Sequence, residues 1–275
     1  MLLSLKKISL VSNQPDDISA IFPEDCVKPG RVDIWAADVD CTEAETNGYA
    51  GFLSAAETAR SARFRFARDR NRYAARHGIL RLLLSVYTCC HPAEVEIRVD
   101  LNGKPYVVDR VHETALQFSM SHSAGRAVFA FGRSGEIGVD IERISGFQEV
   151  QEFVGMNFTP AEIKEVECCP ESMRLEAFFR VWVRKEAVLK ASGDGLAIPL
   201  NCVEVSGLTG GDETWSVRRI KGDALGREFR LTDVMVAPGF AAALAAVNSG
   251  CDLSVSYRHY EPKVLEAGLP GRVTS

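Results

Sequence analysis

Two acidic residues, Asp140 and Glu142, are the first side chains in this sequence whose spacing could do chemistry. They lie in the stretch IGVDIERI, residues 137–144, whose branched aliphatic residues predict a packed strand. Because side chains alternate along a strand, both carboxylates point to the same face, roughly 6.5 to 7 Å apart. They either converge on a cation or stand apart in water, and this stretch alone does not distinguish the two.

A third acid lies in the segment EAFFRVWVRKEAVLKASGDGL, residues 176–196, which has helical spacing and glycines near its end. One stripe of this helix carries Phe179, Trp182, Glu186 and Lys190. A Glu–Lys pair four residues apart is common on exposed helices and contributes only about 0.3 to 0.5 kcal/mol. Here the stripe continues into aromatic residues, so the pair borders a core, where a carboxylate needs a cation. Mg²⁺ is suitable, because it takes one or two carboxylates with waters and phosphate oxygens, and Asp140, Glu142 and Glu186 could form its ligand set.

A basic segment between residues 60 and 81 contains a single acid, Asp69, although the whole chain is acidic. Its arginines are Arg60, Arg63, Arg65, Arg68, Arg70, Arg72, Arg76 and Arg81. Three of them, at residues 68, 72 and 76, follow each other at intervals of four and would form one helical edge. Arginine binds phosphate through two parallel hydrogen bonds, so the segment indicates either a polyphosphate ligand or a solvated face.

Polar residues also gather in LNGKPYVV and FSMSHSAG, around residues 101–108 and 118–125. Asn-Gly followed by Lys-Pro predicts a tight turn that projects Lys104, with Pro105 restricting the backbone after it. Ser121 and His122 come where a predicted strand enters a turn. The sequence contains no nucleophile elbow, no Walker loop and no G-x-G-x-x-G motif.

The surrounding periodicities predict an α+β protein with two halves of similar plan, residues 1–135 and 136–275. We expect strands near residues 32–40, 95–100, 116–121, 127–132, 137–144, 203–207, 215–220 and 227–236. Helical spacing extends over residues 52–66, 70–87 and 176–192. Residues 1–30 are expected to form an irregular extension, and residues 261–275 a loose tail.

The bulk composition excludes several classes of protein. A net charge of −5 over 275 residues argues against a dedicated nucleic-acid binder. No stretch approaches the roughly 20 apolar residues of a membrane span, and the start MLLSLKKISLVSN lacks the pattern of a signal peptide. The 8 cysteines include no C-x-x-C pair, so we take most of them as reduced structural residues. We therefore expect a cytoplasmic protein without a membrane or nucleic-acid partner.

The motifs GKP, FSMSHS, GVDIE and WVRKEAVLKASGDGL, in this order, resemble the Sfp-type 4′-phosphopantetheinyl transferases over residues 32–245. The family patterns G-[IV]-D-x-E and W-x-x-K-E-A-x-x-K match residue for residue. The resemblance implies two pseudo-symmetric α+β halves with the active site between them. It also implies a Mg²⁺-dependent enzyme that transfers the phosphopantetheine arm of coenzyme A to a serine of an apo acyl or peptidyl carrier protein, releasing adenosine 3′,5′-bisphosphate.

By the same resemblance, Asp140, Glu142 and Glu186 would be the Mg²⁺ ligands. Lys190 would contact the pyrophosphate and stabilise charge on the transferring and leaving phosphates. Glu186, directly or through a water, would be the general base for the carrier serine. Trp182 and Lys185 would hold the helix in place.

The resemblance also implies contacts to the nucleotide. Lys104 and Pro105 would hold the adenine end, and Ser121 and His122 the nucleotide phosphates. Arg60 and Arg72 would bind the 3′-phosphate. One turn before Arg60 some family members carry a second basic residue, whereas this chain has Glu57, which departs from the family pattern.

Two other functions remain open from the residues. A non-catalytic module that grips coenzyme A or a carrier protein would use the same arginines and Lys104 but would not require the three acids. Another Mg²⁺-dependent phosphoryl-transfer enzyme would keep the acids and accept a different nucleotide. These motifs do not indicate whether the carrier protein belongs to a fatty acid, polyketide or nonribosomal peptide pathway. We expect the protein to be a monomer.

Overall fold

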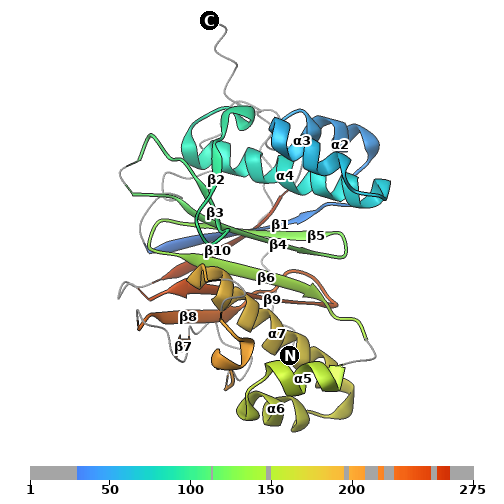
Figure 1. The fold of residues 1–275 in the computed structure, drawn as a ribbon, viewed down its shortest axis with the longest axis vertical. Coiled ribbons are helices and arrows are strands. Elements are labelled where there is room, and N and C mark those ends of the chain that lie inside the picture. The colour runs from blue at the N-terminus through green and yellow to red at the C-terminus, as the bar shows by residue number, and fades with distance from the viewer. Residues whose placement is uncertain are drawn as a thin grey trace, which may run out of the picture.

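The computed structural model describes residues 30–112, 114–146, 150–194, 198–207, 216–219, 226–248 and 253–260. Nearly all of the expected N-terminal extension and the whole expected tail lie outside these ranges. Within them, helices and two four-stranded sheets form a layered molecule (Figure 1). The α+β class predicted from the sequence is confirmed.

The first sheet has the strand order β10-β1-β5-β4. Its strands are β1 (Arg31–Asp38), β4 (Gln117–Ser123), β5 (Arg126–Gly132) and β10 (Ser254–His259). The elements around it are α2 (Glu43–Ala50), α3 (Ala55–Ala62), α4 (Ala67–Thr88), the short 3₁₀ helix η2 (Pro92–Glu94) and the ribbon of β2 (Ile97–Val99) and β3 (Pro105–Val107). Neighbouring strands of the sheet are antiparallel, except that β10 runs parallel to β1.

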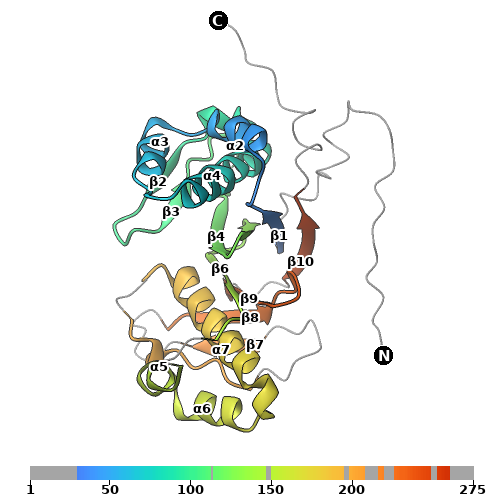
Figure 2. The same ribbon diagram turned by 90° about the vertical axis from the view of Figure 1, so that its right-hand side faces the viewer.

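The second sheet has the antiparallel order β6-β9-β8-β7. Its strands are β6 (Ile137–Arg143), β7 (Ser216–Arg219), β8 (Glu228–Asp233) and β9 (Phe240–Val247). The helices of this half are α5 (Val150–Asn157), α6 (Pro160–Glu167), α7 (Glu171–Ser192) and the short η4 (Leu200–Cys202). In Figure 2 the two groups of helices lie at opposite ends of the molecule, with both sheets between them.

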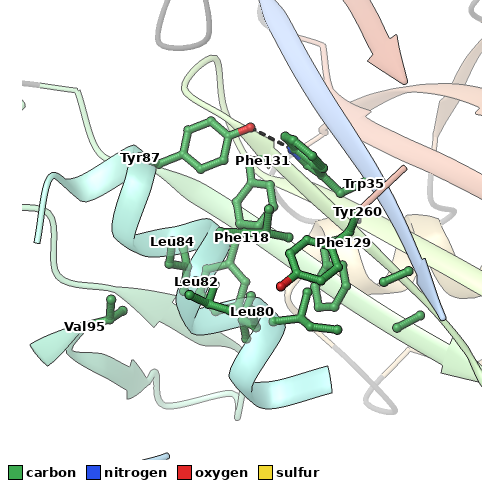
Figure 3. Close-up of a cluster of buried hydrophobic side chains, with 14 of the residues drawn as sticks. Trp35, Leu80, Leu82, Leu84, Tyr87, Val95, Phe118, Phe129, Phe131 and Tyr260 are labelled. Carbon is green, nitrogen blue, oxygen red and sulfur yellow. Dashed lines mark hydrogen bonds between the residues drawn. The ribbon is translucent and has the colours of Figure 1, made fainter. Parts of the chain in front are cut away.

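Three buried clusters hold these layers together. In the first, leucines of α4 pack on aromatic side chains of the first sheet, and Trp35 Nε1 donates to the hydroxyl of Tyr87 at 3.1 Å (Figure 3). In the second, α7 packs on the second sheet. In the third, Val32 and Ile34 of the first sheet meet Val139 and other apolar residues of the second. The sheets therefore pack face to face, and burial of this apolar surface joins the two halves.

The predicted division at residues 135 and 136 falls in the turn between β5 and β6, but the sheets do not follow it completely. Strand β10 comes from the C-terminal part of the chain and pairs with β1, with Ser254 opposite Arg31. The last described strand therefore belongs to the first sheet by its hydrogen bonds, and the division into halves stays a prediction.

One expected strand, residues 203–207, is absent among the described elements. The amide of Val205 donates to the buried carboxylate of Glu162 at 2.8 Å, so a side chain satisfies it instead of a neighbouring strand. Glu162 also pairs with Lys185, whose ammonium lies 2.7 Å away, and both side chains are fully buried. The expected role of Lys185 in holding its helix agrees with this contact.

None of the helices in the described ranges combines the length and apolar character required to span a bilayer.

Candidate active site

A cavity of about 470 Å³ is lined by residues of five elements, α3, α4, β4, β6 and α7. Helices α3 and α4 and strand β4 supply one wall: Arg60, Tyr73, Arg76, His77, Met120, Ser121 and His122. Strand β6 and helix α7 supply the other wall: Asp140, Glu142, Trp182, Glu186 and Lys190. One wall is mainly basic and the other carries all three acids singled out in the sequence, so the cavity is electrically polarised.

Asp140 is the most enclosed of the three acids, with 4% of its surface exposed. Its Oδ1 accepts from Ser121 Oγ at 2.7 Å and from the ammonium of Lys190 at 2.6 Å. Its Oδ2 is buried without a hydrogen-bond partner. A buried carboxylate oxygen left unpaired is costly, so this atom is a ready ligand for a cation.

Glu142 and Glu186 are partly buried in the same cavity. Burial raises the pKa of Glu142, although a 2.7 Å hydrogen bond from Ser123 opposes the effect. Burial also raises the pKa of Glu186, and the negative charge of Asp140 raises it further. The positive charge near these two carboxylates is too small to offset their desolvation and their mutual repulsion. A bound cation would lower both of these energetic costs.

The residues present therefore fit a Mg²⁺ ion, but the structure does not gather them into a finished cluster. Within the described part of the chain, no three His, Cys, Asp or Glu side chains lie close enough together to form a metal-binding group. In this arrangement Lys190 supplies the positive charge next to Asp140. Movement of Lys190 or of the glutamate side chains would be needed for the three acids to share one ion.

Alternate serines of β4 fix the position of the acidic strand. Ser119 Oγ accepts from the amide of Val139 at 3.0 Å, and Ser123 Oγ accepts from the amide of Arg143 at 3.1 Å. Between them, Ser121 donates to Asp140. The two strands belong to different sheets, so these serine side chains replace a backbone ladder. Ser121 thus orients a candidate metal ligand, whereas the sequence predicted that it contacts phosphate.

Helix α7 approaches the acidic strand closely at Gly138. A Cβ atom there would overlap the carbonyl oxygen of Ala187 and the amide nitrogen of Ala191. The missing side chain lets the helix backbone lie directly on β6, which brings Glu186 and Lys190 to the acids of the strand. The glycine of the G-[IV]-D-x-E pattern is therefore a packing requirement.

The basic wall contains a buried cation that has no counter-ion among the described residues. Arg76 is 8% exposed, and its Nε has no hydrogen-bond partner. Its guanidinium lies over the ring of Tyr73, with Cζ 4.7 Å from the ring centroid. Burial lowers the pKa of Arg76 to about 10, and the charge of Arg60 contributes in the same direction. An unpaired arginine in a cavity wall indicates an anionic ligand.

Two histidines stand beside this arginine. Burial lowers the pKa of His122 to about 4, and the positive charges of Arg76 and Lys190 add to the effect. His77 stacks on Tyr73 with 4.1 Å between ring centroids. Its Nδ1 lies 3.3 Å from the carboxylate of Glu57. Glu57, which departs from the family pattern, thus makes a side-chain contact with His77, a residue of the cavity lining.

Three of the predicted nucleotide contacts lie outside the cavity lining. Arg72 pairs with both carboxylate oxygens of Asp40, at 2.5 and 2.7 Å. The ammonium of Lys104 donates to the carbonyl oxygen of Ala191 in the last turn of α7, at 3.1 Å. Pro105 begins strand β3 beside it. Arg60, Ser121, His122 and Lys190 do line the cavity.

The sequence assigned no specific ligand contact to four lining residues: Tyr73, Arg76, His77 and Met120. Arg76 was recognised only as a member of the arginine edge, and Tyr73 and His77 lie in the segment predicted to be helical over residues 70–87. Their spacing did not reveal which face of α4 meets the cavity, because that depends on where β4 and α7 lie. Trp182 was assigned to helix packing, and its ring does stand edge-on to Phe153 at 4.8 Å, but it also lines the cavity.

Two protein-family models match this chain over the ranges that carry the cavity residues. A family model described as "4'-phosphopantetheinyl transferase superfamily" matches residues 136–244, and one described as "4'-phosphopantetheinyl transferase, N-terminal" matches residues 40–133. The matched ranges contain all the acids and arginines of the cavity.

Several curated proteins are similar to this chain. The 4′-phosphopantetheinyl transferase HetI of Nostoc sp. is 36% identical over 167 residues, covering 61% of this chain and 70% of that protein. The phosphopantetheinyl transferase of Thraustochytrium sp. is 32% identical over 189 residues, covering 62% of this chain and 64% of that protein. A 4′-phosphopantetheinyl transferase of Bacillus subtilis is 26% identical over 153 residues, covering 56% and 66% respectively. The chain thus spans slightly less than two thirds of the last two relatives.

Proposed function

Because the chain belongs to the 4′-phosphopantetheinyl transferase superfamily, we propose that it transfers the phosphopantetheine arm of coenzyme A to a serine of an apo carrier protein. The other product would be adenosine 3′,5′-bisphosphate. The Sfp-type resemblance of its motifs and the transferase names of its relatives support the reaction class.

The observation that carries this proposal is the polarity of the cavity. Arg76 is buried and unpaired at the basic wall, and Asp140 keeps a buried, unpaired oxygen at the acidic wall. A ligand that satisfies both must bring negative charge to the first and a cation to the second. A nucleotide diphosphate with Mg²⁺ has this pattern, because the metal binds phosphate oxygens and carboxylates together. A carrier-binding module without catalysis would leave the acidic wall unexplained.

In the proposed mechanism the chain's own residues position the reactants and accept the proton. The hydroxyl oxygen of the carrier serine attacks the pantetheine-side phosphorus while Glu186 accepts the hydroxyl proton. The raised pKa of Glu186 favours this role as a base. The bond from that phosphorus to the oxygen bridging to the adenosine bisphosphate breaks, and Lys190 stabilises the charge that develops on the leaving phosphate. Ser121 holds Asp140 in orientation through its 2.7 Å hydrogen bond.

Asp140, Glu142 and Glu186 would hold the Mg²⁺ ion. When bound, the ion would act as a Lewis acid toward the diphosphate oxygens. Arg60, Arg76 and His122 would contact the nucleotide phosphates. We also propose the nucleotide contacts that the resemblance implies for Lys104, Pro105 and Arg72, although these residues lie outside the cavity lining.

The decisive experiment mixes the purified protein with apo carrier, Mg²⁺ and coenzyme A, and measures the mass of the intact carrier. We expect the carrier to gain one phosphopantetheine group only when all components are present. Binding of coenzyme A without any modified carrier would instead support a non-catalytic module. Modification by another nucleotide substrate in place of coenzyme A would support a different phosphoryl-transfer enzyme.

The same assay over a panel of acyl and peptidyl carrier proteins would identify the partner. A cytoplasmic location and a monomeric state remain predictions from the sequence.

A further inference from the structure

His77 lines the cavity and contacts Glu57 behind it, and the proposed mechanism uses neither residue. Glu57 Oε2 caps the start of α3 at Ser54 and accepts from Arg81 Nε at 2.7 Å. Its Oε1 contacts His77 Nδ1 at 3.3 Å. The side chain of His77 is 19% exposed and lines the cavity between Tyr73 and the arginines.

The contact with Glu57 determines which imidazole nitrogen carries hydrogen. Burial alone would raise the pKa of Glu57, but hydrogen bonds from His77 and Ser54 and the charge of Arg81 outweigh it and lower the pKa to about 2. An ionised carboxylate only accepts hydrogen bonds, so Nδ1 of His77 is the donor. Nε2 makes no hydrogen bond to any residue in the described ranges.

The charged and titratable groups that face His77 come from three elements. Helix α3 supplies Glu57 and Arg60, helix α4 supplies Tyr73 and Arg76, and strand β4 supplies His122, while Arg81 of α4 pairs with Glu57. Burial lowers the pKa of His77, and the charges of Arg76 and Arg60 add to this effect, although the hydrogen bond to Glu57 opposes it. The imidazole of the ligand-free protein is therefore neutral at pH 7.5, and its Nε2 is an acceptor.

A phosphate monoester cannot bind next to that acceptor unless a proton is added. At neutral pH the monoester is largely a dianion and offers only acceptor oxygens. Two acceptors repel each other, whereas one proton between them gives a charge-assisted hydrogen bond. The carboxylate of Glu57 on the other side of the ring stabilises the imidazolium that this produces.

We propose that binding of a phosphate monoester in this cavity is coupled to uptake of one proton, held between His77 Nε2 and the phosphate and supported by Glu57. The proton comes from solvent and no covalent bond changes. This inference rests on the proposed function for the presence of the nucleotide, and it adds a pH-dependent affinity. As the pH rises from the low pKa of free His77 toward its higher pKa in the complex, affinity falls by up to about tenfold per pH unit.

The test is calorimetric titration of the full chain with adenosine 3′,5′-bisphosphate at pH 7.5, in two buffers of different ionisation enthalpy. The difference in apparent heat gives the number of protons taken up. We expect roughly one proton for the unmodified protein. We expect none for His77→Gln, which retains a donor and an acceptor but cannot be protonated at this pH. The affinity should fall between pH 6.5 and 7.5 in the first protein and change little in the second.

Two matched variants separate His77 from other histidines. His259→Gln changes an exposed histidine at the end of β10, outside the cavity lining, and should leave proton uptake intact. Uptake that persists in His77→Gln, or that is lost in His122→Gln while His77 is present, would overturn the assignment to His77. Binding without proton uptake in the unmodified protein would overturn the inference and leave the proposed function standing. Failure of the nucleotide to bind at all would count against the proposed function itself.

Discussion

At the scale of single residues, the cavity contains buried charged groups whose desolvation is not fully compensated by partners within the described part of the protein. Arg76 is a buried cation with no counter-ion in the described part of the chain, and Glu186 is a half-buried carboxylate next to Asp140. Groups of this kind cost stability, and functional sites are where proteins retain them. Substitutions at these positions should therefore change stability and activity in opposite directions.

Replacement of Glu186 by glutamine should abolish carrier modification and stabilise the metal-free protein at alkaline pH. The pKa of Glu186 is raised in the folded state, so its ionisation is unfavourable there. The penalty is absent below the pKa of the unfolded chain and is complete once the pH exceeds the folded-state pKa. The melting temperature of Glu186→Gln should therefore exceed that of the unmodified protein at pH 8 and converge with it at pH 4. Mg²⁺ should raise the melting temperature of the unmodified protein only. Normal turnover by this variant would remove Glu186 from the mechanism.

Replacement of Arg76 by methionine should weaken coenzyme A binding and leave the fold at least as stable. Apolar residues of similar volume often replace a buried charge without loss of stability. Hydrogen bonds from a cation to phosphate are worth about 1.5 to 3 kcal/mol, so the dissociation constant should rise about tenfold or more. The matched control is Arg63→Met, which changes an exposed arginine outside the cavity lining. Equal affinities in the two variants would contradict a ligand contact by Arg76.

At the scale of secondary-structure elements, helix α7 determines the geometry of the acidic wall, and its C-terminal part is held in two ways. Its packing against β6 depends on Gly138, where no side chain fits. At its C-terminal end, Lys104 donates to Ala191, and Arg227 donates to Ser192 at 2.7 Å. Cations at a helix C-terminus satisfy carbonyl groups that have no partner within the helix.

Lys104→Met tests whether this lysine serves the helix or the nucleotide. From the contact with Ala191 we expect a loss of about 1 kcal/mol in the free energy of unfolding, measured by denaturant titration. The control Lys164→Met removes an exposed lysine of α6 and should change stability little. An unchanged stability together with a raised KM for coenzyme A would instead support the adenine contact predicted from the GKP motif.

At the scale of the whole molecule, the two halves share a core and are joined at several levels. Apolar residues of both sheets meet face to face, serines of β4 bind the backbone of β6, and β10 returns to pair with β1. The cavity is lined jointly by residues of α3, α4 and β4 on one side and of β6 and α7 on the other.

This arrangement predicts that neither half folds alone. A fragment of residues 30–135 would lack β10 and expose Val32, Ile34 and Val128, which are buried against the second sheet. We expect it to show no cooperative thermal transition, while the full chain unfolds in a single calorimetric transition whose van't Hoff and calorimetric enthalpies agree. A folded, soluble fragment would show that the halves are independent domains.

Several features could be predicted from local patterns. Alternation in IGVDIERI placed both acids on one face, and helical spacing placed Glu186 and Lys190 together; all four line one cavity. The strand predicted at residues 203–207 was wrong, because a buried glutamate from another helix takes its backbone amide. Local pattern contains no information about such a distant partner.

The sequence by itself determined the family and the acidic and basic residues of the two walls, because their motifs are short and the side-chain directions follow from strand and helix periodicity. Only the tertiary structure decided which polar groups are already paired within the protein. Asp40 binds Arg72, the end of α7 binds Lys104, and Arg76 is left unpaired beside the cavity. The partner of each polar side chain is a residue far away in the chain. Which partner it finds depends on distances between side chains that are established only when the two sheets pack together.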